Sequence, residues 1–600
     1  MARGGTLADK RKWQRRDRAL RLGALLAVLG AIAIVAAAAY GQLFPTPLND
    51  LFALGQGTGD TPAQAPIIQR AEPPFVATPL APCGPGSHKQ PSVDGRVPAG
   101  SAAKGLICNM TLVAHQGTEG GFKVLRYVDT HGHDCAFYDT TLLLPLNALN
   151  PGGGSAGVTV LDMSNPAHPV KTASLLTPAM LSPHESLNLN ARRGLLAAVD
   201  GNPATYPGWV DVYDIHSDCR HPVLDANGPF ARLGHESGFS ADGKTFYATS
   251  TAYNSITAID LTNPKSPHDV WEGNIFSHGM SLSDDGNRAY IADPHHNLLI
   301  LDTSQIQARK PNPQARELSR LTWTAASIPQ NAIPFTENGH PYLLEIDEYN
   351  QSTLNPGGDP NMVGAARIID IADETKPIVV ANLRLAIDQP AEHAAATAAG
   401  DPGTNNQAQG YAAHYCNIPT EVNPKIVACS FIASGLRVFD ISNLVHPKEV
   451  GYYVAPPQPR SENGYMASDF AMSKPAFVPQ RREIWWTDGT TGFYVLRVAA
   501  SVWPSASGGS SAAFGRVVCA TGARRQLVKA AIARHAHVRS VRATLGGHRI
   551  RVIRRGHAYY AVVNPRSIHG SARLVIRVRL TNGRIVVSRR VYRRCGHRRG

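Results

Sequence analysis

The sequence lacks the short motifs that mark many enzyme classes. Its 600 residues contain no Gly-rich phosphate loop that follows a strand, no G-x-S-x-G elbow that leads from a strand into a helix, no H-E-x-x-H and no paired C-x-x-C. The sequence therefore does not indicate nucleotide hydrolysis, α/β-hydrolase chemistry or zincin-type proteolysis. These absences leave open an active site that is assembled from dispersed side chains.

Acidic residues are missing from one end of the chain. Residues 516–600 hold 22 Lys and Arg and no Asp or Glu, and residues 1–22 hold eight basic and two acidic residues. The formal net charge of +14 therefore conceals an acidic middle, residues 23–515, with a net charge of −14. This asymmetry and the length of the chain both predict several domains.

A short strand that ends in Asp recurs along the acidic middle. Successive Asp residues are 52, 46, 42, 68 and 70 positions apart, and a seventh copy has Arg in place of Asp. The copies are Val158–Asp162, Val210–Asp214, Ile256–Asp260, Leu298–Asp302, Ala366–Asp370, Leu436–Asp440 and Phe493–Arg497. A period of about 40–50 residues with several strands per unit is typical of propeller blades. The two long intervals contain residues 347–364 and 389–413, rich in Gly, Pro, Asn and Ala, which we predict as surface loops.

This pattern resembles the LVIVD-repeat family of bacterial and archaeal surface propellers, over roughly residues 105–500. The resemblance and the seven copies imply an all-β fold with a seven-bladed β-propeller. No outer strand follows Val498, whereas residues 109–115 look like an outer strand without a blade before it. We therefore predict that this N-terminal strand completes the last blade and closes the ring. The fold itself implies no particular activity.

The N-terminus has the pattern of a membrane anchor. Residues 1–18 are basic and polar, and residues 19–40 are apolar apart from Arg21. About 20 such residues span a bilayer, so the sequence predicts a single-pass helix with a cytoplasmic N-terminus and an extracytoplasmic body. The alternative is a cleaved signal peptide, because residues 36–39 are small, and the protein would then be secreted. Residues 41–104 are predicted to form a linker or a loosely ordered collar.

Eight cysteines fit an exported protein with disulfides. Cys416 and Cys429 flank a turn at Asn423 and are predicted to pair across adjacent strands. Cys519 and Cys595 bracket the C-terminal domain and are predicted to staple its ends. Among the remaining four we prefer the pairs Cys83–Cys108 and Cys135–Cys219.

After a linker at 501–515, residues 516–600 are predicted to form a small β-sandwich, Ig-like in size. Strands are expected at 541–545, 549–553, 573–580 and 584–592. In residues 573–580 the even positions are apolar, so Arg573, Arg577 and Arg579 should form the opposite face. That face is interpreted as a solvated surface, as a binding site for anionic cell-wall polymer or lipid headgroups, or as a nucleic-acid site. A location outside the cytoplasm favours the envelope and disfavours nucleic acid.

One histidine position repeats when the units are aligned on their turns. His184, His235, His278 and His414 each begin an innermost strand, where Asn331 and Ser473 stand in units five and seven. The first unit has no clear equivalent. Innermost strands start at one mouth of a propeller channel, so these rings should gather there, with Glu185 and Glu236 beside two of them. Converging imidazoles suit Cu, Zn or Fe, and the arrangement resembles selenium-binding and methanethiol oxidase propellers.

Two further interpretations stay open. Each repeated His could instead bond backbone between blades, and His131-Gly-His133-Asp134-Cys135 resembles a metal cluster but falls where a hairpin turn is needed. The sequence thus supports two functions. The first is a membrane-anchored binding scaffold at the cell envelope, with a protein partner on the propeller face. The second is an extracytoplasmic metal-dependent oxidoreductase with a His-lined channel.

Overall fold

The computed structural model describes two parts of the chain. The first part comprises residues 59–504 with gaps at 71, 141–155, 202–207, 233, 251–254, 295–296, 324–326, 354–356, 405–409 and 458–469. The second comprises residues 518–519, 526–529, 538–546, 548–555, 558–564, 568, 571–580 and 585–593. The chain divides after Trp503 into two compact units.

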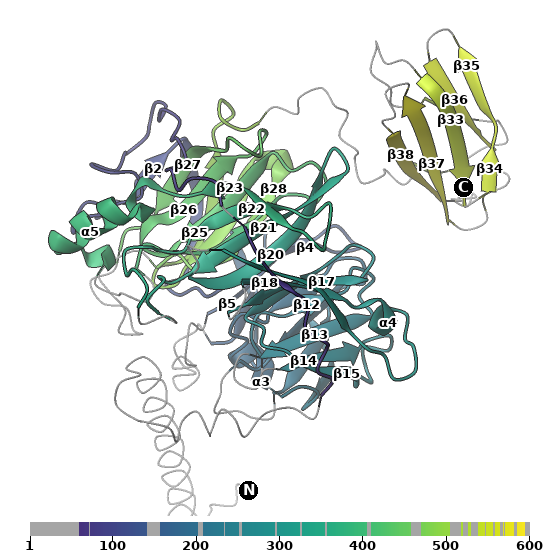
Figure 1. The fold of residues 1–600 in the computed structure, drawn as a ribbon, viewed down its shortest axis with the longest axis horizontal. Coiled ribbons are helices and arrows are strands. Elements are labelled where there is room, and N and C mark those ends of the chain that lie inside the picture. The colour runs from purple at the N-terminus through teal and green to yellow at the C-terminus, as the bar shows by residue number, and fades with distance from the viewer. Residues whose placement is uncertain are drawn as a thin grey trace, which may run out of the picture. The chain divides into compact units, whose positions relative to one another are not determined.

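Seven sheets follow one another along the described part of the first unit (Figure 1). Sheet 1 contains β4 (Val124–Val128), β5 (Asp134–Asp139), β6 (Val158–Asp162) and β7 (Val170–Leu175). Sheet 2 contains β8 (Asn188–Asn190), β9 (Leu195–Val199), β10 (Val210–Asp214) and β11 (Val223–Gly228). Sheet 3 contains β12 (Gly238–Phe239), β13 (Thr245–Ser250), β14 (Ser255–Asp260) and β15 (His268–Asn274). Sheet 4 contains β16 (Gly279–Leu282), β17 (Arg288–Asp293), β18 (Asn297–Asp302) and β19 (Arg316–Thr322).

The remaining sheets of this unit follow the same order. Sheet 5 contains β20 (Ile328–Glu337), β21 (His340–Glu348), β22 (Ala366–Asp370) and β23 (Ile378–Leu383). Sheet 6 contains β24 (Ala413–Asn417), β25 (Ile426–Phe431), β26 (Gly435–Asp440) and β27 (Lys448–Val454). Sheet 7 contains β28 (Ala476–Val478), β29 (Glu483–Asp488), β30 (Gly492–Val498) and the N-terminal β3 (Met110–Gln116). The short helices are α3 (Pro178–Leu181), α4 (Ser304–Gln307), α5 (Pro390–Ala398) and the 3-10 turns Ala386–Asp388, Pro402–Thr404, Ile432–Ser434 and Pro479–Arg481.

The repeated Asp has a local structural cause. Its strand is the third of each sheet and is buried on both faces, as in Val158–Asp162 and Val210–Asp214. The Asp carboxylate then accepts a hydrogen bond from the backbone N–H two residues later, for example Asp162 from Ser164 at 2.8 Å. Asp214, Asp260, Asp302, Asp370 and Asp440 make the same bond. The side chain thus replaces the strand's hydrogen bonds with a turn, which ends the third strand in six of the seven sheets.

The predicted closure of the repeats is confirmed. β3 pairs antiparallel with β30, with Met110 opposite Val498 and His115 opposite Tyr494. Hydrophobic clusters lie between each pair of consecutive sheets, and one cluster joins sheet 7 to sheet 1 through Trp485 and Phe493 on one side and Ala136 and Leu161 on the other. This cyclic, all-β packing fits a β-propeller.

The described part of the segment predicted as a linker or collar, residues 59–104, runs along the edges of the sheets. β1 (Ile67–Gln69) pairs parallel with β19, and β2 (Leu106–Cys108), which follows this segment, pairs antiparallel with β27, so the N-terminal arm adds fifth strands to sheets 4 and 6. Asp60 also bonds the outer strand of sheet 3 at Glu272 and Asn274. The arm covers exposed sheet edges through backbone hydrogen bonds, which need no strand-like side-chain pattern. The predicted loop at 389–413 also contains the helix α5, which begins at Pro390 and is rich in Ala.

Three disulfides stabilise the first unit. They are Cys83–Cys108, Cys135–Cys219 and Cys416–Cys429, the pairs predicted from the sequence. Cys416 and Cys429 are directly opposite each other on β24 and β25. Disulfides of this kind fit an extracellular or periplasmic location.

The C-terminal unit has two sheets. One has the strand order β31 (Val518–Cys519), β38 (Ile585–Arg593), β37 (Ser571–Leu580), β33 (Val538–Leu545) and β34 (His548–Ile550), and the other has β32 (Gln526–Lys529), β36 (Ala558–Val563) and β35 (Val552–Arg555). Both contribute to one core, in which Leu574, Ile576 and Val578 are buried as the alternation predicts. The strand predicted at 549–553 is wrong, because the chain passes from one sheet to the other at Arg551. Cys595 and the side chains of Arg573 and Leu580 lie outside the described residues.

No helix within the described ranges is long and apolar enough to cross a membrane. The predicted anchor at 19–40 lies outside these ranges.

Candidate metal centre

The innermost strands place one residue of each sheet at a common position. Aligning the sheets on the pairing of their first and second strands gives the set Phe122, Glu185, His235, His278, Gln330, His414 and Ser473. The following residues form a second set, Lys123, Ser186, Glu236, Gly279, Asn331, Tyr415 and Lys474. The alignment of the repeats on their turns, which assigned His184 and Asn331 to this common position, was therefore wrong by one residue in sheets 2 and 5. β20 has a register shift between Pro329 and Asn331, and turn patterns cannot reveal such a bulge.

Three histidines bond the backbone at their Nδ1 atoms. His235 Nδ1 lies 2.7 Å from the carbonyl oxygen of His278, and His278 Nδ1 lies 2.8 Å from that of Pro329. His414 Nδ1 lies 2.7 Å from the carbonyl oxygen of Met472. A carbonyl only accepts, so each Nδ1 carries the hydrogen and each neutral ring keeps its lone pair on Nε2. These hydrogen bonds from Nδ1 to a backbone carbonyl of the neighbouring sheet are the ones predicted as the alternative to a metal site. In metal sites the same kind of hydrogen bond orients a ligating imidazole, so the two interpretations are compatible.

The Nε2 atoms lie among two buried carboxylates. His184 Nε2 is 3.2 Å from His235 Nε2, and His184, Glu185 and His235 each offer a ligand atom within 4.8 Å of the others. His278 Nε2 lies 3.2 Å from one oxygen of Glu348, and His414 Nε2 lies 3.0 Å from the other. Separations near 3 Å resemble those between donors around one ion with bonds of about 2.0–2.2 Å. The structure thus brings together all four predicted histidines and Glu185.

Two side chains of this centre were missed by the sequence reasoning. Glu348 ends β21, far from the repeated position, and no local pattern marks it. Gln330 is the bulged residue of β20, and its Nε2 donates to Glu185 Oε2, which also accepts from Tyr415 Oη at 2.8 Å. Gln330 Oε1 is buried and has no hydrogen-bond partner among the described residues. It is an acceptor available to a hydrogen-bond donor on whatever binds here.

The ionisable groups of the centre are strongly perturbed. Burial lowers the pKa of His184 and lowers that of His235 well below its usual value, which keeps both rings neutral. Burial opposes charge on His414 as well, but hydrogen bonds and attraction from Glu185 and Glu348 raise its pKa to about 10. For Glu185, attraction by His235 and His414 outweighs burial and holds the pKa well below the ordinary value. The neutral imidazoles of His184 and His235 beside the ionised carboxylate of Glu185 are the forms that bind a transition metal, whereas His414 is protonated at pH 7 and is not in that form.

Glu236 does not belong to this centre, contrary to the prediction. Its carboxylate pairs with Lys123 Nζ at 2.7 Å and accepts from the backbone N–H of Met280 at 3.1 Å. It stands in the second set of residues, one position after His235. The hydrogen bonds of the Glu236 carboxylate are therefore with Lys123 and the backbone of β16 rather than with the imidazoles.

The His131 to Cys135 stretch forms the predicted turn between β4 and β5. Asp129, His133 and Asp218 lie close enough to hold an ion. However, Arg220 binds both oxygens of Asp218, at 2.9 and 3.1 Å, and Asp129 accepts backbone N–H groups of the turn. These contacts already satisfy the carboxylates, so we place the metal hypothesis on the His184 centre.

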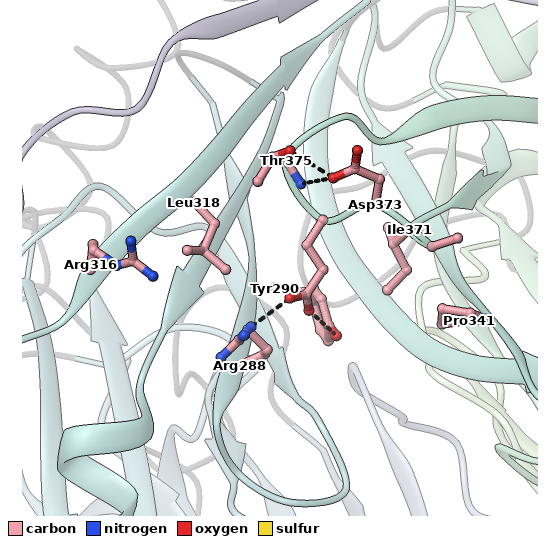
Figure 2. A pocket seen from close by; sticks show the side chains of 10 residues that line it. Arg288, Tyr290, Arg316, Leu318, Pro341, Ile371, Asp373 and Thr375 are labelled. Carbon is pink, nitrogen blue, oxygen red and sulfur yellow. Dashed lines mark hydrogen bonds and ion pairs between the residues drawn. The ribbon is translucent and has the colours of Figure 1, made fainter.

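Two other features carry no chemistry. A pocket of about 510 Å³ lies between sheets 4 and 5 (Figure 2), where Arg288 is paired with Glu374 at 2.7 Å and Tyr290 approaches the same carboxylate. Arg288 is thus paired within the lining, and Arg316 pairs with Asp302 outside it at 3.5 Å. Gly238 to Thr245 has the spacing of a phosphate loop, G-x-x-x-x-G-K-T, but forms the hairpin between β12 and β13. A phosphate loop needs a following helix, which a hairpin does not supply.

Comparisons with known proteins agree with the repeat prediction. The chain matches the LVIVD repeat at residues 153–177, 278–306 and 430–455. A search of curated proteins gives no match. Similar solved structures include the Kuenenia stuttgartiensis hydrazine synthase (14% identity, 64% of this chain and 97% of that chain, TM-score 0.40) and the Pseudomonas aeruginosa periplasmic gluconolactonase PpgL (12%, 57% and 88%, 0.38). The WD40 repeats of RRP9 are also similar (10%, 67% and 99%, 0.38). These neighbours include two enzymes and a WD40-repeat protein.

Proposed function

We propose that the seven sheets are the blades of a closed seven-bladed propeller and that its inner strands bind a transition metal ion outside the cytoplasm. The ligands are His184, Glu185 and His235, with His278, His414 and Glu348 around them. The cyclic order of the hydrophobic clusters supports the ring. The three disulfides support the location.

One observation carries the metal proposal. Three imidazoles from three sheets donate Nδ1–H to backbone carbonyls, while their Nε2 atoms and that of His184 lie beside two buried carboxylates. Histidines with a purely structural role would need only the hydrogen bonds from Nδ1 to the backbone and not the contacts between Nε2 and the carboxylates. A buried carboxylate needs compensating partners, and a metal ion supplies charge that hydrogen bonds alone do not.

The donor set indicates the chemistry. Two imidazoles and one carboxylate leave positions open for water or substrate, as in non-haem Fe(II) and catalytic Zn sites. With a redox-active metal such as Fe or Cu, the protein would be an extracytoplasmic oxidoreductase. Tyr415 and Gln330 orient Glu185 through hydrogen bonds. Gln330 Oε1 would accept a hydrogen bond from a donor on the bound molecule.

Metal analysis of the purified protein, before and after loading with Fe(II), Cu(II) and Zn(II), tests this proposal. We expect one ion per chain, and we expect His235→Ala with His278→Ala to abolish it while circular dichroism stays unchanged. His133→Ala, in the exposed turn, is the matched control and should retain the ion. A wild-type protein that stays metal-free after loading ends the oxidoreductase hypothesis.

The second candidate function is a binding scaffold at the cell envelope. The basic C-terminal unit, with exposed Arg577 and Arg579, favours attachment to anionic polymer or lipid headgroups. A helix at 19–40 would add membrane anchorage, and the propeller face would accept a protein partner. Fractionation of cells with a tagged chain tests the location, and release of the chain by high salt alone would count against the anchor.

A further inference from the structure

The C-terminal unit concentrates arginines on one face of its larger sheet. The strands β33 and β37 are neighbours in this sheet (Figure 1, yellow strands). Arg542 on β33 is directly opposite Arg577 on β37, and Ser540 is opposite Arg579. Arg549 on β34 stands opposite Thr544, the next outward position of β33. All four arginines are exposed, whereas the alternate residues of β37 are buried in the core. We call Arg542, Arg549, Arg577 and Arg579 the arginine face.

This arrangement is unfavourable without a ligand. Residues directly opposite across antiparallel strands have Cβ atoms about 4.5–5.5 Å apart, and like charges there destabilise the pair. Residues 516–600 contain no acidic residue that could neutralise Arg542 and Arg577. A solvated sheet face ordinarily interleaves both signs of charge. The arginine face therefore carries an excess of positive charge that a bound anion would neutralise.

The residue type indicates the anion. Of the 22 basic residues in 516–600, 21 are Arg and one is Lys. The guanidinium group binds phosphate through two parallel hydrogen bonds, which the ammonium group of Lys cannot do. Arg577 and Arg579 are two residues apart on one strand, about 6.8 Å. A flat row of such groups suits successive phosphates of an extended chain.

We infer that the arginine face binds an anionic phosphodiester polymer of the cell envelope. The inference rests on the second candidate function and deepens it by naming the residues and the chemical class. The described outward neighbours of the arginines are Ser540, Thr544 and the half-buried Val575, whereas membrane-surface binding needs exposed apolar side chains that insert, so lipid headgroups fit less well. Among the described residues of this unit, the large apolar side chain that is exposed is Leu527, on the other sheet. The three disulfides fit a location outside the cytoplasm, which disfavours nucleic acid as the ligand.

The test uses the full chain and poly(glycerol phosphate) as the probe. We expect Arg542→Gln with Arg577→Gln to weaken binding at least ~10-fold at low salt and to reduce the slope of log affinity against log salt by about 1.4, two phosphate contacts of about 0.7 each. The matched control is Arg554→Gln with Arg555→Gln, an equal loss of charge on β35, which should change affinity less than ~3-fold. Arg542→Lys with Arg577→Lys keeps the charge and should recover only part of the affinity.

Each other outcome overturns the inference. Equal weakening by the two glutamine pairs would show diffuse attraction rather than this face. Full affinity in the lysine pair would show that guanidinium geometry is not used. Tighter binding to phosphatidylglycerol vesicles, to polyglutamate or to a single-stranded oligonucleotide would assign the face to lipid, carboxylate polymer or nucleic acid. Absence of any polymer binding by the unaltered chain would instead remove the second candidate function, and none of these results touches the metal content.

Discussion

The two units of this protein use arginine in opposite ways. In the first unit, Arg367, Arg384 and Arg437 are at most 1% exposed and lie among carboxylates. In the C-terminal unit, Arg542 and Arg577 are exposed, face each other and have no acidic residue near them in sequence. The comparison shows two roles of arginine. A buried arginine that is paired with carboxylates stabilises the fold, whereas an exposed arginine without an acidic neighbour is available to bind an anionic partner.

Arg367 shows the first task in detail. It lies 2.7 Å from Glu345 and from Asp347, 3.5 Å from Glu72 of the N-terminal arm, and its guanidinium stacks over Trp323. Arg437 likewise pairs with Glu449 of β27 and Asp94 of the arm, both at 3.1 Å. These pairs tie the arm to the sheets that it crosses. Substitutions that remove these ion pairs test whether they also contribute to the free energy of unfolding.

The largest effect is expected for Arg367→Met. The change leaves buried carboxylates without a cation, which costs about 3–5 kcal/mol of the free energy of unfolding at pH 7. Burial and Asp347 raise the pKa of Glu345 well above its usual value, so the loss should shrink as the pH falls and Glu345 takes up a proton. Urea denaturation at pH 7 and pH 5, followed by tryptophan fluorescence, measures both. A loss below about 1 kcal/mol at pH 7 would contradict the role assigned to the buried pair.

The pH dependence of the metal-free protein should be next in size. The pKa of His414 is raised to about 10, from about 6.5 in the unfolded chain, so the imidazolium stabilises the fold fully below pH 6.5. That contribution falls as the pH rises from 6.5 and is gone above 10, a loss on the order of a few kcal/mol. His414→Gln should be less stable at pH 7 but should lack this decline. Identical pH profiles in the two proteins would refute the ion pair.

Gln330→Leu should weaken metal binding without unfolding the ring. Gln330 donates to Glu185 and helps to fix the carboxylate that faces His184 and His235. Loss of such a supporting contact typically lowers metal affinity about 10–100-fold. Competition with a chelator of known affinity gives the ratio. Asn331→Leu, one position along the same strand, is the control, and an equal loss there would mean that packing rather than orientation is responsible.

The smallest effect is expected for Arg577→Gln in the absence of polymer. An exposed surface change lies within about 0.5 kcal/mol, and relief of the Arg542 repulsion should make it slightly stabilising, more at low salt than at high salt. Thermal unfolding of the full chain at two salt concentrations measures the sign. A loss of more than about 1 kcal/mol would show that Arg577 holds this unit together, and the contrast with Arg367 would fail.

Sequence reasoning succeeded where structure is set by neighbours along the chain. The Asp that ends the third strand in six of the seven sheets bonds the backbone two residues later, so its period reveals the sheets directly. The alternation of β37 and the pairing of Cys416 with Cys429 across one hairpin are local in the same sense. Reasoning from turns failed at Gln330, because the bulge that selects it depends on how β20 pairs with β21.

By itself, the sequence determined the all-β repeat, the closing strand around residues 109–115, the Cys416–Cys429 pair and the histidines that meet at the inner strands. Each follows from hydrogen bonds, alternation or counting that a short stretch of chain contains. Tertiary structure alone decided that Glu348 and Gln330 join those histidines, that Glu236 turns to Lys123, and that residues 59–104 bind along sheet edges. Those outcomes depend on which distant strands lie side by side, and backbone hydrogen bonds and buried charge pairs leave no periodic trace in the residues that form them.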